Sequence, residues 1–194
     1  MENLSLIQDR ALIEDILNGQ KDKFALLMHK YSANIYGVLC GMGSGEQDAQ
    51  DLTQETFIQA YRKLAHHQRD RSFAAWLYRI AVNLLKERGR RKNVRQKIAN
   101  GQLMDSERMD GDTPEKHYLR KERQAELNQL IGQLPDDYRL VLLLRYTNEL
   151  SYEEIGEITG LPPNKVRNCL YRAKQGLKKR MEAEGGGGIE MLQS

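Results

Sequence analysis

Apolar residues recur at spacings of three and four along most of this chain, which is the period of an amphipathic helix. The first half contains four such stretches, over about residues 4–17, 24–42, 52–64 and 73–84. The pair Asn18-Gly19 follows the first of them, as expected at a helix C-terminus. No alternation typical of strands is long enough to build a sheet. The pattern therefore predicts an all-α fold whose first half is a four-helix domain.

The helical period is lost around residues 93–117, where turn-forming pairs such as Asn100-Gly101 occur. A second helical set begins near Glu115 and is interrupted at Leu134-Pro135, after which Asp136 can cap the next helix. The chain ends in four glycines and a short tail, which we expect to be flexible. These breaks predict a first domain over residues 1–95, a flexible linker over 96–117, a second domain over 118–182 and a Gly-rich tail over 183–194.

The second domain contains a short helix with both of its ends marked in the sequence. Ser151 and Glu154 have the spacing of a capping box, and Gly160 is placed to end the helix. A tight turn at 161–163 leads into a longer helix from about Asn164, with an inward apolar stripe at Val166, Leu170, Ala173 and Leu177. This succession predicts a helix-turn-helix.

The outward face of the longer helix is basic and polar. It carries Asn164, Lys165, Arg167, Asn168, Tyr171, Arg172 and Lys174, and residues 163–181 contain no Asp or Glu. Such a face suits the phosphates and base edges of a DNA major groove. A solvated basic helix would have the same composition, and the capped helix before it favours DNA reading over that alternative.

Two further patterns lie in the first domain. The third helix begins with acids, and Asp48, Asp51, Gln54 and Glu55 form a face suited to a basic protein partner, although acids near a helix N-terminus also serve its dipole. The fourth helix ends in bases, among them Lys86, Arg88, Arg90 and Arg91, and has Trp76 near its start. Bases beside aromatics suit unpaired nucleic acid. A Trp on an apolar face is, however, more often a core residue.

Composition excludes several classes of protein. The net charge is only +3, so the distribution of charge is more informative than its sum. The two cysteines, Cys40 and Cys169, are isolated and have no metal-ligand spacing, so we expect no disulfide, no metal and no cofactor. We see no signal peptide or membrane-spanning run and expect a cytoplasmic protein. No catalytic constellation or phosphate loop is visible, so we do not expect an enzyme.

Four blocks in order resemble the conserved segments of the extracytoplasmic-function (ECF) sigma factors, the smallest members of the sigma-70-like family. They are DAQDLTQETFIQAY, RSFAAWLYRIAVNLLKERGRR, LPDDYRLVLLLRY and LSYEEIGEITGLPPNKVRNCLYRAKQGLKK, and the resemblance extends from about residue 11 to residue 180. It implies a transcription initiation factor that binds core RNA polymerase and promoter DNA and is restrained by an anti-sigma factor, in a stress-responsive regulon. It implies no membrane insertion.

The resemblance also implies roles for individual residues. Asp51, Gln54 and Glu55 would dock on the clamp helices of the largest polymerase subunit, and the 140–144 face would help meet the polymerase flap. The 66–72 loop, with Trp76, Arg79 and Asn83, would capture the promoter element nearer the start site and hold it open. The helix from Asn164 would read the distal element.

The recognition helix departs from the family pattern at two places. Asn164-Lys165 replaces the more usual Gly-Thr, and Cys169 stands where a polar residue is frequent, which leaves base preference open. The alternative function is a helix-turn-helix repressor or activator without sigma activity. A response regulator is disfavoured because the first half has no strands for a receiver domain.

Overall fold

The structure is a computed structural model that describes residues 4–68, 71–98, 129–148 and 150–183. All regular elements of this part of the chain are helical, which agrees with the predicted all-α fold. The α-helices are α1 (Leu4–Leu17), α2 (Phe24–Gly41), α3 (Glu46–Lys63), α4 (Phe73–Ile98), α6 (Asp136–Asn148), α7 (Tyr152–Thr159) and α8 (Pro163–Ala183), with 3-10 turns η1 (Lys21–Lys23) and η2 (Leu64–His66). Residues 129–132 are also helical.

The first domain is built around α2, which packs against α3 and α4, while α1 lies across α2. Leu27, Ile35 and Leu77 are fully buried at the centre of this domain, as their helical spacing predicts. A charged group joins the core: Asp9 of α1 is buried and accepts hydrogen bonds from the Tyr31 hydroxyl and from Lys30 Nζ. A buried carboxylate needs such partners, and here they attach α1 to α2.

The second domain packs α8 against both α6 and α7. The predicted inward stripe of the longer helix is confirmed, since Val166, Leu170, Ala173 and Leu177 are all buried. Asp136, expected before the helix as its cap, is instead the first residue of α6. Assignments of helix ends commonly differ by one residue.

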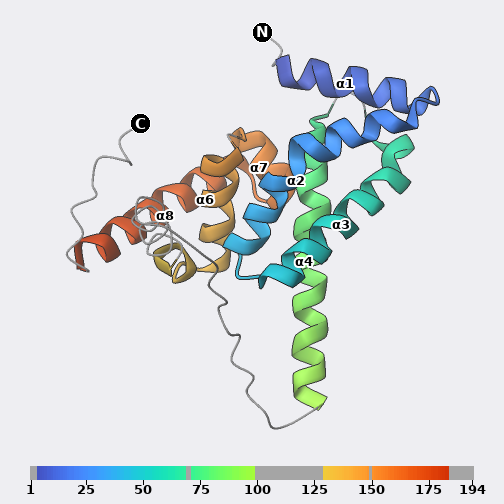
Figure 1. Ribbon diagram of the computed structural model, residues 1–194. Coiled ribbons are helices and arrows are strands. Elements are labelled where there is room, and N and C mark those ends of the chain that lie inside the picture. Colours follow the sequence, from blue (N-terminus) through green and yellow to red (C-terminus); the bar gives the residue numbers. More distant parts are fainter. Residues whose placement is uncertain (1–3, 69–70, 99–128, 149, 184–194) are drawn as a thin grey trace, which may run out of the picture.

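The two domains are in direct contact, because α6 packs on α2 and α7 packs on α4. Figure 1 shows α6, α7 and α8 on one side of α2 and α4, with α3 on the other. Buried residues of both domains, including Ile35, Tyr78, Val141 and Ile155, belong to a single apolar cluster. A smaller cluster around Leu177 lies within the second domain alone.

Helix α4 is longer than the sequence pattern predicts. The helical period is lost after about residue 92, yet the backbone stays helical to Ile98. This stretch is rich in Lys, Arg and Gln, which have high helix propensity, and the first turn-forming pair is Asn100-Gly101. Figure 1 shows the C-terminal half of α4 extending away from the other helices, so propensity rather than packing sustains it. The expected start near Glu115 of the second helical set lies outside the described residues.

Candidate nucleic-acid interface

The helix-turn-helix is fixed locally by the capping residues that the sequence predicts. Ser151 Oγ accepts a hydrogen bond from the Glu154 amide at 3.1 Å, and Glu154 Oε2 accepts one from the Ser151 amide at 2.8 Å. Gly160 ends α7 in the left-handed conformation with φ of 77°, which glycine adopts without a Cβ clash. The turn after Gly160 then leads into α8, whose first residue is Pro163. The predicted capping box is thus confirmed.

Most of the predicted reading face of α8 is open to solvent. Asn164, Lys165, Arg167, Asn168, Tyr171 and Arg172 are all exposed. Tyr171 is 65% exposed, so folding buries little of the apolar surface of its ring. An exposed ring among cationic and amide side chains is well placed to contact a nucleic acid.

Three tyrosines hold basic side chains along the edges of this face. The ring of Tyr152 lies 6.0 Å from the Arg167 guanidinium, and the Tyr138 hydroxyl accepts a 3.3 Å hydrogen bond from Arg172. Lys174 is half-buried with Nζ 5.1 Å from the Tyr146 ring centroid, so it is turned toward α6. These contacts restrict the side chains before any ligand binds, which lowers the entropy lost on binding.

Cys169 lies at the border between this face and the core. Its side chain is half-buried and packs against the apolar cluster. Burial raises the pKa of the Cys169 thiol, and the carboxylate of Asp137 raises it further. A neutral thiol contributes no charge to this face of α8.

A second basic face runs along α4. Positions 76, 79, 83, 86 and 90 recur at spacings of three and four and share one side of the helix. The side chains of Arg79, Asn83, Lys86 and Arg90 are exposed there, and Trp76 is half-buried. Arg91 is also exposed but forms an ion pair with Glu87 at 2.6 Å. This face of α4, called the α4 stripe below, is thus aromatic at its start and basic at its end.

Trp76 forms one wall of a pocket of about 270 Å³. The other lining residues are His66, His67, Gln68, Arg71, Ala75, Arg79 and Glu157. The ring of His67 lies against Trp76 with 4.9 Å between centroids, and Phe73 supports both rings. Trp76 is therefore neither a plain core residue nor a free platform: it is half-buried, contacts the rings of His67 and Phe73, and also lines the pocket. His66, His67, Gln68 and Arg71 belong to the 66–72 loop that the family resemblance assigns to promoter capture, although no single residue of that loop was named.

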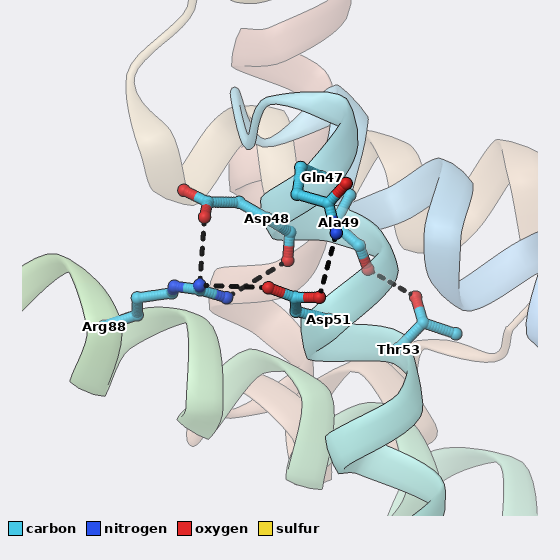
Figure 2. A network of polar contacts seen from close by, with 6 residues as sticks. All are labelled: Gln47, Asp48, Ala49, Asp51, Thr53 and Arg88. Carbon is cyan, nitrogen blue, oxygen red and sulfur yellow. Dashed lines mark hydrogen bonds and ion pairs between the residues drawn. The ribbon is translucent and has the colours of Figure 1, made fainter.

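Arg88 departs from the basic stripe on which the sequence placed it. It lies five residues after Asn83, so it points toward α3, and its Nη2 is 2.9 Å from Asp48 Oδ1 and 3.5 Å from Asp51 Oδ2. Arg88 Nη1 also donates to the Asp48 carbonyl at 3.3 Å. Figure 2 shows this guanidinium between the two carboxylates. Arg88 thus links α4 to α3, a role that its helical spacing and the acids of α3 could have indicated.

The acidic face of α3 lies where the sequence predicts it. Asp51 and Gln54 are exposed, while Glu55 and Asp48 are half-buried. Asp51 also accepts a 3.2 Å hydrogen bond from Gln47 one turn earlier. The face is therefore polar and preorganised, and two of its acids already have a cation beside them.

Two features are absent from the part of the chain that the structure describes, residues 4–68, 71–98, 129–148 and 150–183. No group of three His, Cys, Asp or Glu side chains there could hold a metal ion. None of the described helices is long and apolar enough to cross a bilayer.

These features define a class of protein: a two-domain helical factor with a basic helix-turn-helix, a second basic face beside an aromatic pocket, and an acidic face on α3. Comparison with known families finds two matching segments of the chain. Residues 27–95 match "Sigma-70 region 2" and residues 124–177 match "Sigma-70, region 4". The first match covers α3 and most of α4, and the second covers α7 and most of α8.

Whole-chain relatives have similar lengths. The chain is 37% identical to the RNA polymerase sigma-H factor of Pseudomonas aeruginosa, covering 90% of this chain and 94% of the relative. It is 35% identical to the ECF RNA polymerase sigma factor SigW of Bacillus subtilis, covering 87% and 94%. The chain therefore belongs to the ECF sigma factors of the sigma-70 family, which initiate transcription with bacterial RNA polymerase.

Solved structures show the same fold at lower identity. CnrH in complex with the cytosolic domain of CnrY matches with a TM-score of 0.69 at 22% identity, covering 90% of this chain and 97% of that one. The sigma factor RpoE of Bartonella quintana, in complex with the anti-sigma factor NepR, matches with a TM-score of 0.68 at 19% identity, covering 84% and 96%.

Proposed function

We propose that this sigma factor divides promoter recognition between its two basic faces and docks on core polymerase through α3. In this division α8 reads the distal element in the major groove. The Trp76 stripe of α4 captures the unpaired proximal strand, and Asp51, Gln54 and Glu55 meet the polymerase clamp. The observation that carries the proposal is the aromatic pocket at the start of the α4 stripe.

The pocket has the chemistry that an extruded base requires. Ligand pockets usually exceed about 300 Å³, so a volume of about 270 Å³ suits a group as small as a single flat base. Trp76 and His67 offer rings for stacking, while Arg71 and Arg79 offer cations for the adjoining phosphates. The exposed Asn83, Lys86 and Arg90 extend that cationic track along α4. Holding a base out of the stack costs a few kcal/mol, which such contacts offset.

Arg88 is left out of the DNA-contacting set in this proposal. Its guanidinium is engaged by Asp48 and Asp51, so we assign it to positioning the docking face of α3. Lys174 is assigned a supporting role for the same kind of reason, since it packs on Tyr146. The remaining predicted DNA-contacting residues keep their assignment.

Run-off transcription tests the function directly. Purified core polymerase with this protein should initiate at a subset of fragments from a genomic library, and core alone should not. The Trp76→Ala variant should bind core but fail to open those promoters. If the wild-type protein bound core and yet initiated on no fragment, the assignment of promoter recognition to these faces would be wrong. A footprint on duplex DNA in the absence of polymerase would instead favour a helix-turn-helix repressor.

We also propose that a dedicated anti-sigma factor restrains this protein within a stress-responsive regulon in the cytoplasm. Support comes from the two structural relatives, one bound to the cytosolic domain of CnrY and the other to the anti-sigma factor NepR. A partner that co-purifies with the native protein should suppress its run-off transcription in proportion to its concentration. A co-purifying protein without that effect would not support the proposal.

A further inference from the structure

Both stacking rings of the aromatic pocket rest on Phe73, the first residue of α4. Its side chain is buried, and its ring centroid lies 5.7 Å from the centroid of His67 and 5.7 Å from that of Trp76. Phe73 itself does not line the pocket. The orientation of the two rings that would stack on a base therefore depends on a residue outside the pocket lining.

Phe73 is supported in turn by Tyr31 of α2. The centroids of these two rings are 5.8 Å apart, and their planes are tilted by 57°. Tyr31 is buried, and it does not line the aromatic pocket either. Aromatic rings in contact favour particular relative orientations because of their charge distribution. The position of the Tyr31 ring thus constrains that of Phe73.

The Tyr31 ring is held at its other end by Asp9 of α1. The Tyr31 hydroxyl donates a hydrogen bond to Asp9 Oδ2, and Lys30 Nζ donates to Asp9 Oδ1 at 2.5 Å. Asp9 is only 3% exposed, so moving the hydroxyl away would leave a buried carboxylate short of a donor, which costs free energy. Tyr31 is therefore fixed both by its hydroxyl and by its ring.

A second, smaller cavity adjoins the aromatic pocket on the side of α1. Its volume is about 130 Å³, and its lining includes Asp9, Ile13, His67, Arg71 and Phe73. His67 and Arg71 line both cavities. Empty space deprives the lining side chains of contacts on one side. The ring contacts that remain, with Tyr31 at their start, therefore matter more for where His67 and Phe73 lie.

From these observations we infer that Tyr31 is a positioning residue for strand capture: anchored by Asp9, its ring holds Phe73, which sets how His67 and Trp76 face an extruded base. The inference rests on the proposed function of the aromatic pocket. Rings that are ordered before the base arrives lose less entropy on binding. Helices α1 and α2, which contribute no residue to the pocket lining, thereby take part in promoter opening.

Three substitutions in the full chain test the inference. Tyr31→Leu removes the ring, whereas Tyr31→Phe keeps the ring and removes only the hydroxyl. Phe24→Leu is the matched control, because Phe24 is a buried ring of the same helix that contacts Phe57 and Tyr61 rather than Phe73. If Tyr31→Leu does not fold, Tyr31→Met takes its place, since the flexible Met side chain fills irregular gaps.

The first measurement is the fluorescence of Trp76, the only tryptophan of the chain, in the free protein. Tyr31→Leu should shift the emission to longer wavelength, because a loosened indole ring contacts more water. Phe24→Leu should lower the melting temperature as well but leave the emission unchanged. Tyr31→Phe should emit like the wild-type protein.

The second measurement is the rate of open-complex formation on a duplex promoter from the run-off selection, at increasing concentrations of the complex with core polymerase. Tyr31→Leu should lower the maximal rate about tenfold, equivalent to about 1.4 kcal/mol, the order of one aromatic pair. The concentration that gives half the maximal rate should not change. Loss of folded protein would have the reverse effect, because it lowers the active concentration but not the rate at saturation. Tyr31→Phe should recover most of the rate, and Phe24→Leu should keep it.

Unchanged emission in Tyr31→Leu, or a maximal rate equal to that of Phe24→Leu, would overturn the inference. A Tyr31→Phe variant as defective as Tyr31→Leu would also overturn it, because the ring would then not be the support. Opening at the wild-type rate by Trp76→Ala would instead refute strand capture by the pocket, whatever the emission of the Tyr31 variants. The two failures are therefore distinguishable.

Discussion

Reversal of charge at Asp51 should abolish docking on core polymerase while the fold survives. The side chain is 49% exposed, its carboxylate lies 3.5 Å from Arg88, and Gln47 donates a hydrogen bond to it. Helix α3 begins at Glu46, so Asp51 is beyond the first turn and the helix dipole contributes little to its effect on folding.

The cost to stability is small because the ion pair is exposed. Asp51→Lys removes a pair worth about 0.2–1 kcal/mol and leaves Asp48 only 2.9 Å from Arg88. We expect the free energy of unfolding to fall by about 1 kcal/mol, which lowers the melting temperature by roughly 2–4 °C for a chain of this length. A lysine against a basic clamp surface costs several kcal/mol, so core affinity should fall by about 100-fold or more.

Core affinity and thermal melting should be measured side by side for Asp51→Lys and Asp22→Lys. Asp22 is an exposed acid of the same domain, so its reversal makes the same change in net charge away from α3. Arg88→Ala removes the cation that positions Asp48 and Asp51, so it should weaken core binding, but by less than Asp51→Lys does. If Asp51→Lys melted normally and bound core as tightly as Asp22→Lys, the docking assignment would be refuted.

Four other substitutions separate the remaining roles. Arg167→Ala should weaken duplex binding at the distal element by about 1–3 kcal/mol if the residue touches a base, and Arg172→Ala should act in the same direction; unchanged promoter affinity in both would leave α8 a merely solvated face. Asn83→Ala should slow open-complex formation on duplex promoters more than on premelted ones, and equal defects on both templates would argue against strand capture. Ser151→Ala should lower the free energy of unfolding by about 1 kcal/mol through loss of the cap, and an unchanged melting temperature would contradict this.

The helix-turn-helix could be predicted from sequence because its determinants are local. Ser151, Glu154 and Gly160 act within one turn of each other, and the buried stripe beginning at Val166 repeats at the helical period. Each of these signals is independent of the rest of the chain. The boundaries of α7 and α8 therefore fall within one or two residues of the expected ones.

The basic charge of α4, taken without its helix face, wrongly groups Arg88 with the residues of the basic stripe. Lys86 and Arg90 share the side of Asn83, but Arg88 points toward α3 and meets Asp48 there. Helical spacing alone separates Arg88 from the stripe. Its partner, however, is 40 residues away in the chain and follows only from the packing of α3 on α4.

The contact between the domains could not be predicted from periodicity at all. An apolar stripe shows that a helix face is buried but not which surface covers it, so Leu143 could equally have faced its own domain or a partner protein. The Tyr78 hydroxyl donates a hydrogen bond to the Asn148 side chain, 70 residues away, and no local rule pairs them. That more than one surface can cover an apolar helix face is physically useful in an initiation factor. Faces that pack on each other in the free chain can exchange that packing for polymerase and DNA, provided the difference in free energy is only a few kcal/mol. In the described part of the chain, α6 packs on α2, α7 packs on α4, and buried residues of both domains share one apolar cluster, so the faces that such an exchange would expose are known only from the structure.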